Sequence, residues 1–391
     1  TTLSNNLISA IVEDGLGNFF FFSFYGLNKI NPGKDATKFE KFYSQKEDPN
    51  SLSDNLIWGI TPSSIDRDKF YIGTANGLTF LKISQKKIEK ISIRNPDNLQ
   101  FGTGTGIVIE EIINDEKILW INSYAGLLRY NLTQNKFNRY LPDKTNPNSI
   151  ASNQINKIYK DRSGVLWIAT NKGLSFFTSK NNKFNSTFLS MPFDFETAKL
   201  NSQNTTSLLN TSNGNLIIGT DNGLFYSIKS LEGIELNKHP QLSKENIWSL
   251  AQDKSENVWI GTYGQGLFQL NLKNNKVVNH DILKTIIISQ SRNFIKSLLV
   301  DDKNNLWIGT WGVGLARFNL SNKELTHYHH VSNNSKSISH DDVWVIYQDS
   351  KSRIWIGTSG GGLNLFDQSN GGIFYRLNSD SQNQQGLNSN S

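Results

Sequence analysis

The chain has 391 residues, of which 37% are hydrophobic, a formal net charge of +6 and no cysteine. This length is ample for a large core, but the low apolar content means that Trp and Phe must supply much of the buried area. Disulfide and thiol chemistry are excluded, and no apolar stretch approaches the length needed to span a membrane.

The positive charge is spread over polar turns, as at Lys86, Lys254 and Lys303, and does not form a stripe beside stacking aromatic residues. This pattern argues against a nucleic-acid partner. It leaves a mild preference for anionic partners, such as an acidic polysaccharide or a membrane surface.

One phrase recurs eight times along the chain: an apolar or aromatic pair, then Gly-Thr or a relative, a tight turn and Gly-Leu. The clearest copies read Trp-Ile-Gly-Thr at 259–262, 307–310 and 355–358. In chain order, and 42 to 51 residues apart, the copies begin at Phe20, Tyr71, Trp120, Trp167, Ile217, Trp259, Trp307 and Trp355. A period of this size indicates a repeat architecture.

Residues 246–280 show the internal order of one copy. Four short apolar-rich runs, beginning at Ile247, Val258, Leu267 and Val277, are separated by polar or Gly-containing turns. This pattern predicts four antiparallel strands, and no segment keeps helical spacing. We therefore expect an all-β propeller with four-stranded antiparallel blades, each with its first strand innermost. Eight copies allow one eight-bladed ring, or a seven-bladed ring plus one blade elsewhere; the unbroken spacing of the last copies favours eight.

The residues that recur in copies of the phrase suggest how each blade is stabilised. The tryptophans that open the phrase are predicted to pack between blades; they are Trp120, Trp167, Trp259, Trp307 and Trp355. The glycines fit turns with positive φ, or strand positions where the backbone is closely approached. The Thr is expected to anchor the turn through a side-chain hydrogen bond.

The unit resembles the two-component regulator propeller repeat, which combines a Leu-Ser-Asn loop, a strand ending in Asp, a Gly/Asn turn, Leu-Trp-Ile-Gly-Thr and Gly-Leu. Segments 161–170 and 350–358 fit it closely, and the resemblance covers essentially the whole chain. It implies the extracytoplasmic, periplasmic sensor half of a membrane-bound regulator, with no catalysis in this domain and no cofactor. Such regulators are commonly hybrid histidine kinases that respond to complex glycans, and sometimes diguanylate cyclases.

The opening loop at 3–8 matches the loop at 52–57, and residues 386–390 resemble the same loop again. We therefore expect residues 1–391 to form one propeller domain, the first of a longer sensor protein. The expected partners are a glycan or other small ligand, a following propeller or linker domain of the same chain, and a second copy in a full-length homodimer.

A first set of candidate binding residues follows the Thr of each phrase, in the turn between the second and third strands. Function is usually carried by loops on a rigid scaffold. In chain order the set reads Phe24, Ala75, Tyr124, Asn171, Asp221, Tyr263, Trp311 and Ser359. Exposed aromatic rings can stack on sugars while Asn, Asp and Gln side chains nearby form hydrogen bonds with the sugar hydroxyls. The alternative is that these rings only cover the strand ends beneath them.

A second set lies on the innermost strand, two residues before its central apolar residue: Ser9, Trp58, Glu110, Asn156, Thr206, Trp248, Lys296 and Trp344. The three Trp residues either line the channel mouth or pack between blades. The charges of Glu110 and Lys296 require water, a partner or a ligand.

Two other classes of function are weighed against a sensor: a propeller enzyme acting on polysaccharide as a hydrolase or lyase, and a protein-interaction ring. His327 and His329 share one face of a predicted outer strand, so a metal pair is geometrically possible. An outer edge is solvated and no third ligand is fixed nearby, and no nucleophile elbow, phosphate loop or catalytic carboxylate pair stands out.

Overall fold

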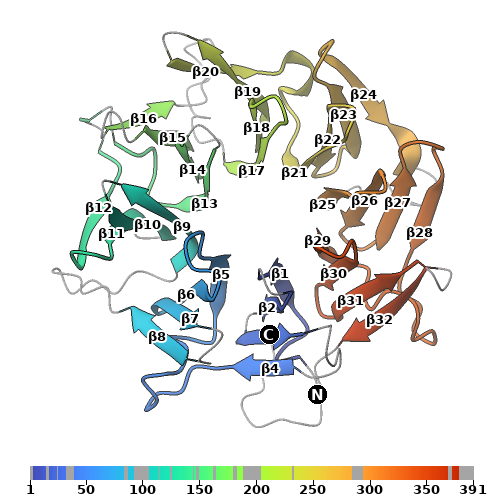
Figure 1. Ribbon diagram of the computed structural model, residues 1–391. Helices are drawn as coiled ribbons and strands as arrows, with labels where there is room; N and C mark the ends of the chain where they lie inside the picture. The colour runs from blue at the N-terminus through green and yellow to red at the C-terminus, as the bar shows by residue number, and fades with distance from the viewer. Residues whose placement is uncertain are drawn as a thin grey trace.

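Eight four-stranded antiparallel sheets form a ring around a central opening in the computed structural model (Figure 1). The structure describes residues 3–14, 17–23, 25–31, 39–82, 87–91, 105–113, 115–123, 126–143, 145–146, 149–161, 164–178, 183–187, 204–230, 233–283, 294–368 and 372–377. Each sheet consists of four strands that follow one another in sequence, and every sheet belongs to the ring. The eight-bladed propeller is confirmed.

The first strand of each blade lies nearest the central opening (Figure 1). These strands are β1 (Ile8–Glu13), β5 (Ile57–Pro62), β9 (Thr105–Ile113), β13 (Ile155–Lys160), β17 (Thr205–Asn210), β21 (Ile247–Gln252), β25 (Ile295–Val300) and β29 (Val343–Gln348). The second strands are β2 (Phe19–Ser23), β6 (Lys69–Thr74), β10 (Glu116–Ser123), β14 (Leu166–Thr170), β18 (Leu216–Thr220), β22 (Asn257–Thr262), β26 (Asn305–Thr310) and β30 (Ile354–Thr358).

The third strands are β3 (Leu27–Ile30), β7 (Gly77–Lys82), β11 (Gly126–Asn131), β15 (Gly173–Thr178), β19 (Gly223–Ser230), β23 (Leu267–Asn271), β27 (Leu315–Asn319) and β31 (Gly362–Asp367). The outermost strands are β4 (Phe39–Phe42), β8 (Lys87–Ile91), β12 (Lys136–Tyr140), β16 (Lys183–Thr187), β20 (Gly233–Lys238), β24 (Lys276–His280), β28 (Leu325–Tyr328) and β32 (Ile373–Leu377). Two single 3-10 turns are described, η1 (Pro240–Leu242) and η2 (Asp281–Leu283), and no described helix is long and apolar enough to cross a membrane.

The five tryptophans that open the phrase are buried at equivalent positions, with at most 1% of their surface exposed, which confirms the prediction. Each indole N–H donates a hydrogen bond to a carboxylate, which is the Asp directly after the first strand in four blades and Glu111, within β9, in blade three. The donor–acceptor distances are 2.7 Å for Trp120–Glu111, 3.0 Å for Trp167–Asp161, 3.0 Å for Trp259–Asp253, 2.8 Å for Trp307–Asp301 and 2.8 Å for Trp355–Asp349. A buried indole therefore has its single donor satisfied.

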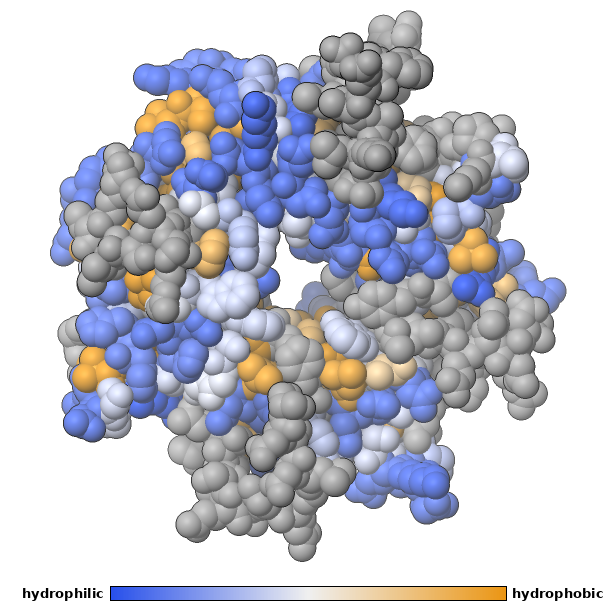
Figure 2. Space-filling model, turned by 180° about the vertical axis from the view of Figure 1, so that it is seen from behind, coloured by the Kyte–Doolittle hydropathy of each residue, from blue (hydrophilic) through white to orange (hydrophobic). Residues whose placement is uncertain are grey.

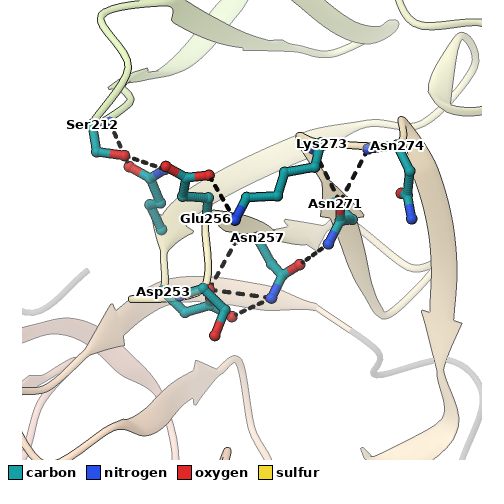
Figure 3. A network of polar contacts seen from close by, with 9 residues as sticks. Ser212, Asp253, Glu256, Asn257, Asn271, Lys273 and Asn274 are labelled. Atoms are coloured by element: carbon teal, nitrogen blue, oxygen red, sulfur yellow. Dashed lines mark hydrogen bonds and ion pairs between the residues drawn. The ribbon is translucent and has the colours of Figure 1, made fainter.

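The same carboxylate organises the turn between the first and second strands, as Figure 3 shows for blade six. Asp253 Oδ1 accepts the backbone N–H of Asn257 at 2.9 Å, and the Asn257 side-chain amide donates back to Asp253. Asn271 of β23 donates in turn to Asn257 Oδ1 at 2.8 Å. One Asp thus fixes a turn and a core tryptophan together.

The Thr of the phrase anchors the next turn, as expected. Its hydroxyl, or that of Ser123, donates to the carbonyl of the Gly that follows the turn, at 2.7 to 3.0 Å in the seven blades where the bond is described. The strand glycine serves the contact between blades. A Cβ at Gly309 would meet the Ser297 hydroxyl of its own blade and would lie 2.7 Å from Cγ1 of Val343, which opens the next blade. Glycine therefore leaves room for both the neighbouring strand and the next blade.

A hydrogen-bonded clasp also links neighbouring blades. A side chain near the end of the first strand accepts the backbone N–H of the preceding blade's first turn. The pairs are Glu110 with Ser64 at 3.0 Å, Gln252 with Ser212 at 2.8 Å and Gln348 with Asp302 at 3.0 Å. Blade eight joins blade one through the same clasp, and Trp355 packs there against Phe19 with ring centroids 5.0 Å apart. The ring closes without exchanging a strand between its first and last blades.

Candidate ligand-binding face

The turn residues of the first candidate set occupy equivalent places on one face of the ring. Each described member donates its backbone N–H to the residue just before the first strand of its own blade. These bonds are Ala75–Leu56, Asn171–Gln154, Asp221–Asn204, Tyr263–Asn246, Trp311–Phe294 and Ser359–Asp342, at 2.8 to 3.1 Å. Phe24 and Tyr124 lie outside the described residues. The set therefore follows the rim of the channel on this face.

The second set coincides with a β-bulge in the innermost strand. In β21, Ile247 pairs with Thr262 and Ser249 with Gly261, so Trp248 is the extra residue between them. The same register shift places Ser9, Trp58, Asn156, Thr206, Lys296 and Trp344 at the bulge of their blades. A bulge re-aims the side chain of its extra residue. These seven predicted positions are therefore equivalent.

Glu110 does not lie at this bulge, so the prediction that its strand position is equivalent to the other seven was wrong. The assignment treated Ile112 as the central apolar residue of its strand, but Ile112 is 56% exposed. The buried residue is Val108, which pairs with Ile121, so the register shift of blade three falls between Thr105 and Val108. Glu110 lies farther along β9, where it accepts hydrogen bonds from the Tyr71 hydroxyl at 2.6 Å and from the turn of blade two. It forms a clasp between blades and not the channel mouth.

Four aromatic side chains of blades six and seven form a continuous cluster, here called the aromatic rim: Trp248, Tyr263, Phe294 and Trp311. Tyr263 stacks on Phe294 with ring centroids 4.2 Å apart and an interplanar angle of 18°. Trp248 lies 4.7 Å from Tyr263 and 6.1 Å from Trp311. Tyr263 and Trp311 remain 41% and 46% exposed. The rim is therefore a mutually supported surface that still presents large aromatic faces to solvent.

Lys296 adds a positive charge directly beside the aromatic rim. Its Nζ lies 4.4 Å from the ring centroid of Trp248 and 5.5 Å from that of Trp344, on the next blade. Partial burial lowers the pKa of Lys296 below its usual value, because the charged form is desolvated. Among the described residues, no carboxylate forms an ion pair with it.

The rim of blades four and five is polar instead. The Asn171 amide donates to Gln154 Oε1 at 2.5 Å, and Asn156 donates to Asn204 Oδ1. Asp221 Oδ1 accepts the backbone N–H of Asn204 at 2.9 Å, while burial raises the pKa of Asp221. The structure thus connects Asn156 to Asp221 through Asn204, across blades four and five, and pairs Asn171 with Gln154 within blade four.

Two other predicted residues belong to neither group. Trp58 is 37% exposed on blade two. The Thr206 hydroxyl bonds the Gly219 carbonyl at 3.0 Å and also the carbonyl of Ile247, the neighbour of Trp248 in blade six. Figure 2 shows the central opening from behind, with pale side chains of intermediate hydropathy along its left rim, the side on which blades six to eight lie. A separate cavity of about 320 Å³ lies between blades seven and eight, lined by Asp302 and Lys303 among others. It is formed by turns at the opposite ends of the strands and contains none of the predicted binding residues.

Sequence reasoning missed Phe294, which completes the aromatic rim. It occupies the position just before the first strand, where four of the other described blades have Gln154, Asn204, Asn246 and Asp342. An aromatic residue among these polar ones was the available signal.

The histidine pair has structural partners. His327 Nε2 lies 2.6 Å from the Val313 carbonyl, and the rings of His327 and His329 are 5.5 Å apart. Within the described ranges, no three His, Asp or Glu side chains are grouped so that they could hold a metal ion.

Comparison with known proteins identifies the repeats. The family model described as "Two component regulator propeller" matches residues 149–172, 241–264, 289–312 and 337–360. Histidine kinase P4 of Formosa agariphila is 27% identical over 290 residues, which are 71% of this chain and 20% of that protein. The extracellular domain of the hybrid two component system BT4673 from B. thetaiotaomicron superimposes with a TM-score of 0.54 at 20% identity, over 93% of this chain and 51% of that chain.

The chain thus spans about a fifth of the curated relative and about half of the solved chain. At 20% identity the solved structure supports the propeller fold alone. The matched segments contain the Trp-Ile-Ala-Thr phrase of blade four and the Trp-Ile-Gly-Thr phrases of blades six, seven and eight, and the structure repeats the same blade eight times. Four segments of this eight-bladed ring therefore match the two-component regulator propeller repeat.

Proposed function

We propose that this ring is the periplasmic ligand-sensing part of a membrane-bound signal-transduction regulator, and that it binds an oligosaccharide or polysaccharide fragment without catalysing its turnover. One observation carries the binding proposal: Tyr263 and Trp311 hold exposed rings in a packed cluster beside the channel. Aromatic faces in fixed positions can stack on the apolar faces of sugars, and polar groups nearby can orient the hydroxyls.

The signalling part of the proposal rests on the kinds of protein that this chain resembles. One relative is named a histidine kinase, and a solved neighbour is the extracellular part of a two-component system. A histidine kinase or a diguanylate cyclase is the output domain that we propose for the parent protein. Ligand binding would transmit a signal by favouring one arrangement of the ring with the following domain, or with the second copy of a homodimer, because a ligand shifts an equilibrium only when it binds the two states differently.

The test is calorimetric titration of an oligosaccharide panel into the parent ring and into Trp311→Ala. We expect the substitution to weaken binding about three- to tenfold, because a stacked ring contributes roughly 0.5 to 1.5 kcal/mol beyond its buried area. Tyr375→Ala is the matched control, since Tyr375 is 48% exposed on the outermost strand β32. It should bind like the parent.

Three results would contradict the proposal. Equal losses in Trp311→Ala and Tyr375→Ala, or unchanged affinity in both, would remove the aromatic rim from the binding site. Hydrolysis or elimination products in the titrated samples would assign an enzyme. Binding to a partner protein with none to any glycan would assign an interaction ring.

A further inference from the structure

Binding of a neutral sugar would not account for the positive charge of Lys296 beside the aromatic rim. The β25 bulge places it between two tryptophans from the adjacent blades, with Nζ 4.4 Å from the Trp248 ring and 5.5 Å from the Trp344 ring. An ammonium group has three hydrogen-bond donors. Among the described residues, none forms a hydrogen bond or an ion pair with the Lys296 ammonium group.

Burying a charge without a partner is unfavourable. The two indole faces offset part of this cost, since a cation over an aromatic ring gains roughly 0.5 to 2 kcal/mol. The two indole rings cannot supply hydrogen-bond acceptors for all three ammonium donors. The pKa of Lys296 is lowered because burial removes water from the ammonium group and the indole rings do not replace it. An anion would supply what is missing.

Acidic residues in the turns of this face make other contacts. The Asp342 carboxylate, just before β29, lies 3.9 Å from His340 Nδ1, and the Asp342 backbone carbonyl accepts the Ser359 N–H. Asp341 accepts the backbone N–H of His330 at 2.6 Å. Asp221 belongs to the polar group of blades four and five. None of them forms an ion pair with Lys296.

The Lys296 ammonium group and the aromatic rim meet at Trp248. The Trp248 ring centroid lies 4.4 Å from Lys296 Nζ and 6.1 Å from the ring centroid of Trp311. One short oligosaccharide can therefore reach both. We propose, building on the function proposed above, that the ligand is an acidic oligosaccharide, with a carboxylate or sulfate bound by Lys296 and a neighbouring ring stacked on Trp311 and Tyr263.

The experiment uses an array of uronate-containing and sulfated oligosaccharides, each printed beside its carboxyl-reduced or desulfated counterpart, followed by calorimetry on the pairs that bind. The parent ring should bind an acidic member at least tenfold more tightly than its uncharged counterpart. Lys296→Met should abolish this difference, because Met keeps an unbranched side chain between the tryptophans while removing the charge. Lys296→Arg should retain it. Lys276→Met is the control, because Lys276 is exposed at the start of the outermost strand β24.

The results separate the two proposals. Equal binding of both members of a pair, lost in Trp311→Ala and unchanged in Lys296→Met, would overturn the acidic ligand and leave the glycan sensor standing. Binding of no glycan would overturn both. Preference for the carboxyl-bearing or the sulfated members identifies which anion Lys296 binds. Added salt should weaken the parent's binding more than that of Lys296→Met, and thermal melts exclude a folding defect.

Discussion

Glu13 and Ser350 lie at opposite ends of the chain, yet the Glu13 carboxylate accepts the Ser350 backbone N–H at 2.8 Å. This bond has the geometry of the clasps inside the ring, where Gln252 and Gln348 hold equivalent places. The last interface is therefore built like the others.

Removing this clasp should loosen the closure between blades eight and one. We expect Glu13→Ala to lower the free energy of unfolding by about 1 to 3 kcal/mol, because the carboxylate accepts hydrogen bonds from both the backbone N–H and the hydroxyl of Ser350. Glu13→Gln should be nearly neutral, because glutamine serves at the same position in blades six and eight. Urea denaturation measures both variants, and equal midpoints for parent and Glu13→Ala would show that the clasp does not stabilise the ring.

Trp307→Ala should cost about 3 to 5 kcal/mol, because it removes a large buried aromatic side chain and leaves a cavity. It also deprives the buried Asp301 carboxylate of its indole donor. Trp311→Ala, in the same blade but exposed, should cost about 1 kcal/mol or less. A denaturant midpoint and slope for Trp307→Ala that match the parent would contradict the packing described here.

Gly309→Ala should destabilise the contact between blades seven and eight by about 1 to 3 kcal/mol, the usual cost of an overpacked core. The added methyl would meet the Ser297 hydroxyl of its own blade as well as Val343 Cγ1 at 2.7 Å. The double variant Gly309→Ala/Val343→Ala should lose less than the sum of the single changes, because the second removes one of these two obstructing groups. Additive losses in thermal and chemical denaturation would show that Val343 is not the obstacle.

His239 makes stability depend on pH. Its side chain is buried, with Nε2 3.1 Å from Asn275 Oδ1, and burial lowers the pKa of His239 below 6.5. The unfolded chain therefore binds a proton near pH 6.5 that the folded ring does not bind. This contribution to stability is present above pH 6.5 and is lost as pH falls below it, by at most about 1.4 kcal/mol per pH unit. Denaturation between pH 7.5 and 5 should show a shallower loss in His239→Gln; parallel curves would exclude His239 as the cause.

Lys296→Met should raise stability at neutral pH, since it removes a desolvated charge. The folded pKa of Lys296 lies below the unfolded value. The unfolded chain therefore keeps its proton to higher pH, and the penalty for the charged form fades as pH rises through the folded pKa. The stabilising effect should be largest near pH 7 and smaller near pH 10. A variant that melts below the parent at pH 7 would mean that the charge contributes to folding.

The eight repeats could be predicted from the sequence because the four strands of each blade are consecutive in the chain. The phrase marks the second strand, its turn and the third strand, and so it predicted eight equivalent blades, the buried tryptophans and the Thr-anchored turns. The packing between blades could be predicted from the sequence only in part. The close approach of Val343 to Gly309 and the clasp formed by Glu110 depend on which side chain faces the next blade, and spacing alone does not determine this.

The error at Glu110 has the same origin. The innermost strand of blade three contains five apolar residues within 107–113, so several registers fit the period of two, and only burial of Val108 against Ile121 selects one. For the binding face, the sequence predicted which positions lie on the rim. It did not predict that Trp248, Tyr263 and Trp311 would meet, because their contact depends on the angle between blades and on Phe294.

The extra residue at the bulge of the innermost strand can change without altering the framework of its blade. Its extra residue has no partner in the ladder, so a substitution there leaves the hydrogen bonds of the sheet intact. On the function proposed above, related rings would accept different ligands through point changes at these seven bulge positions, while the Asp–Trp pairs and the interblade glycines stay the same. In this chain the seven positions hold three tryptophans, a lysine, an asparagine, a threonine and a serine.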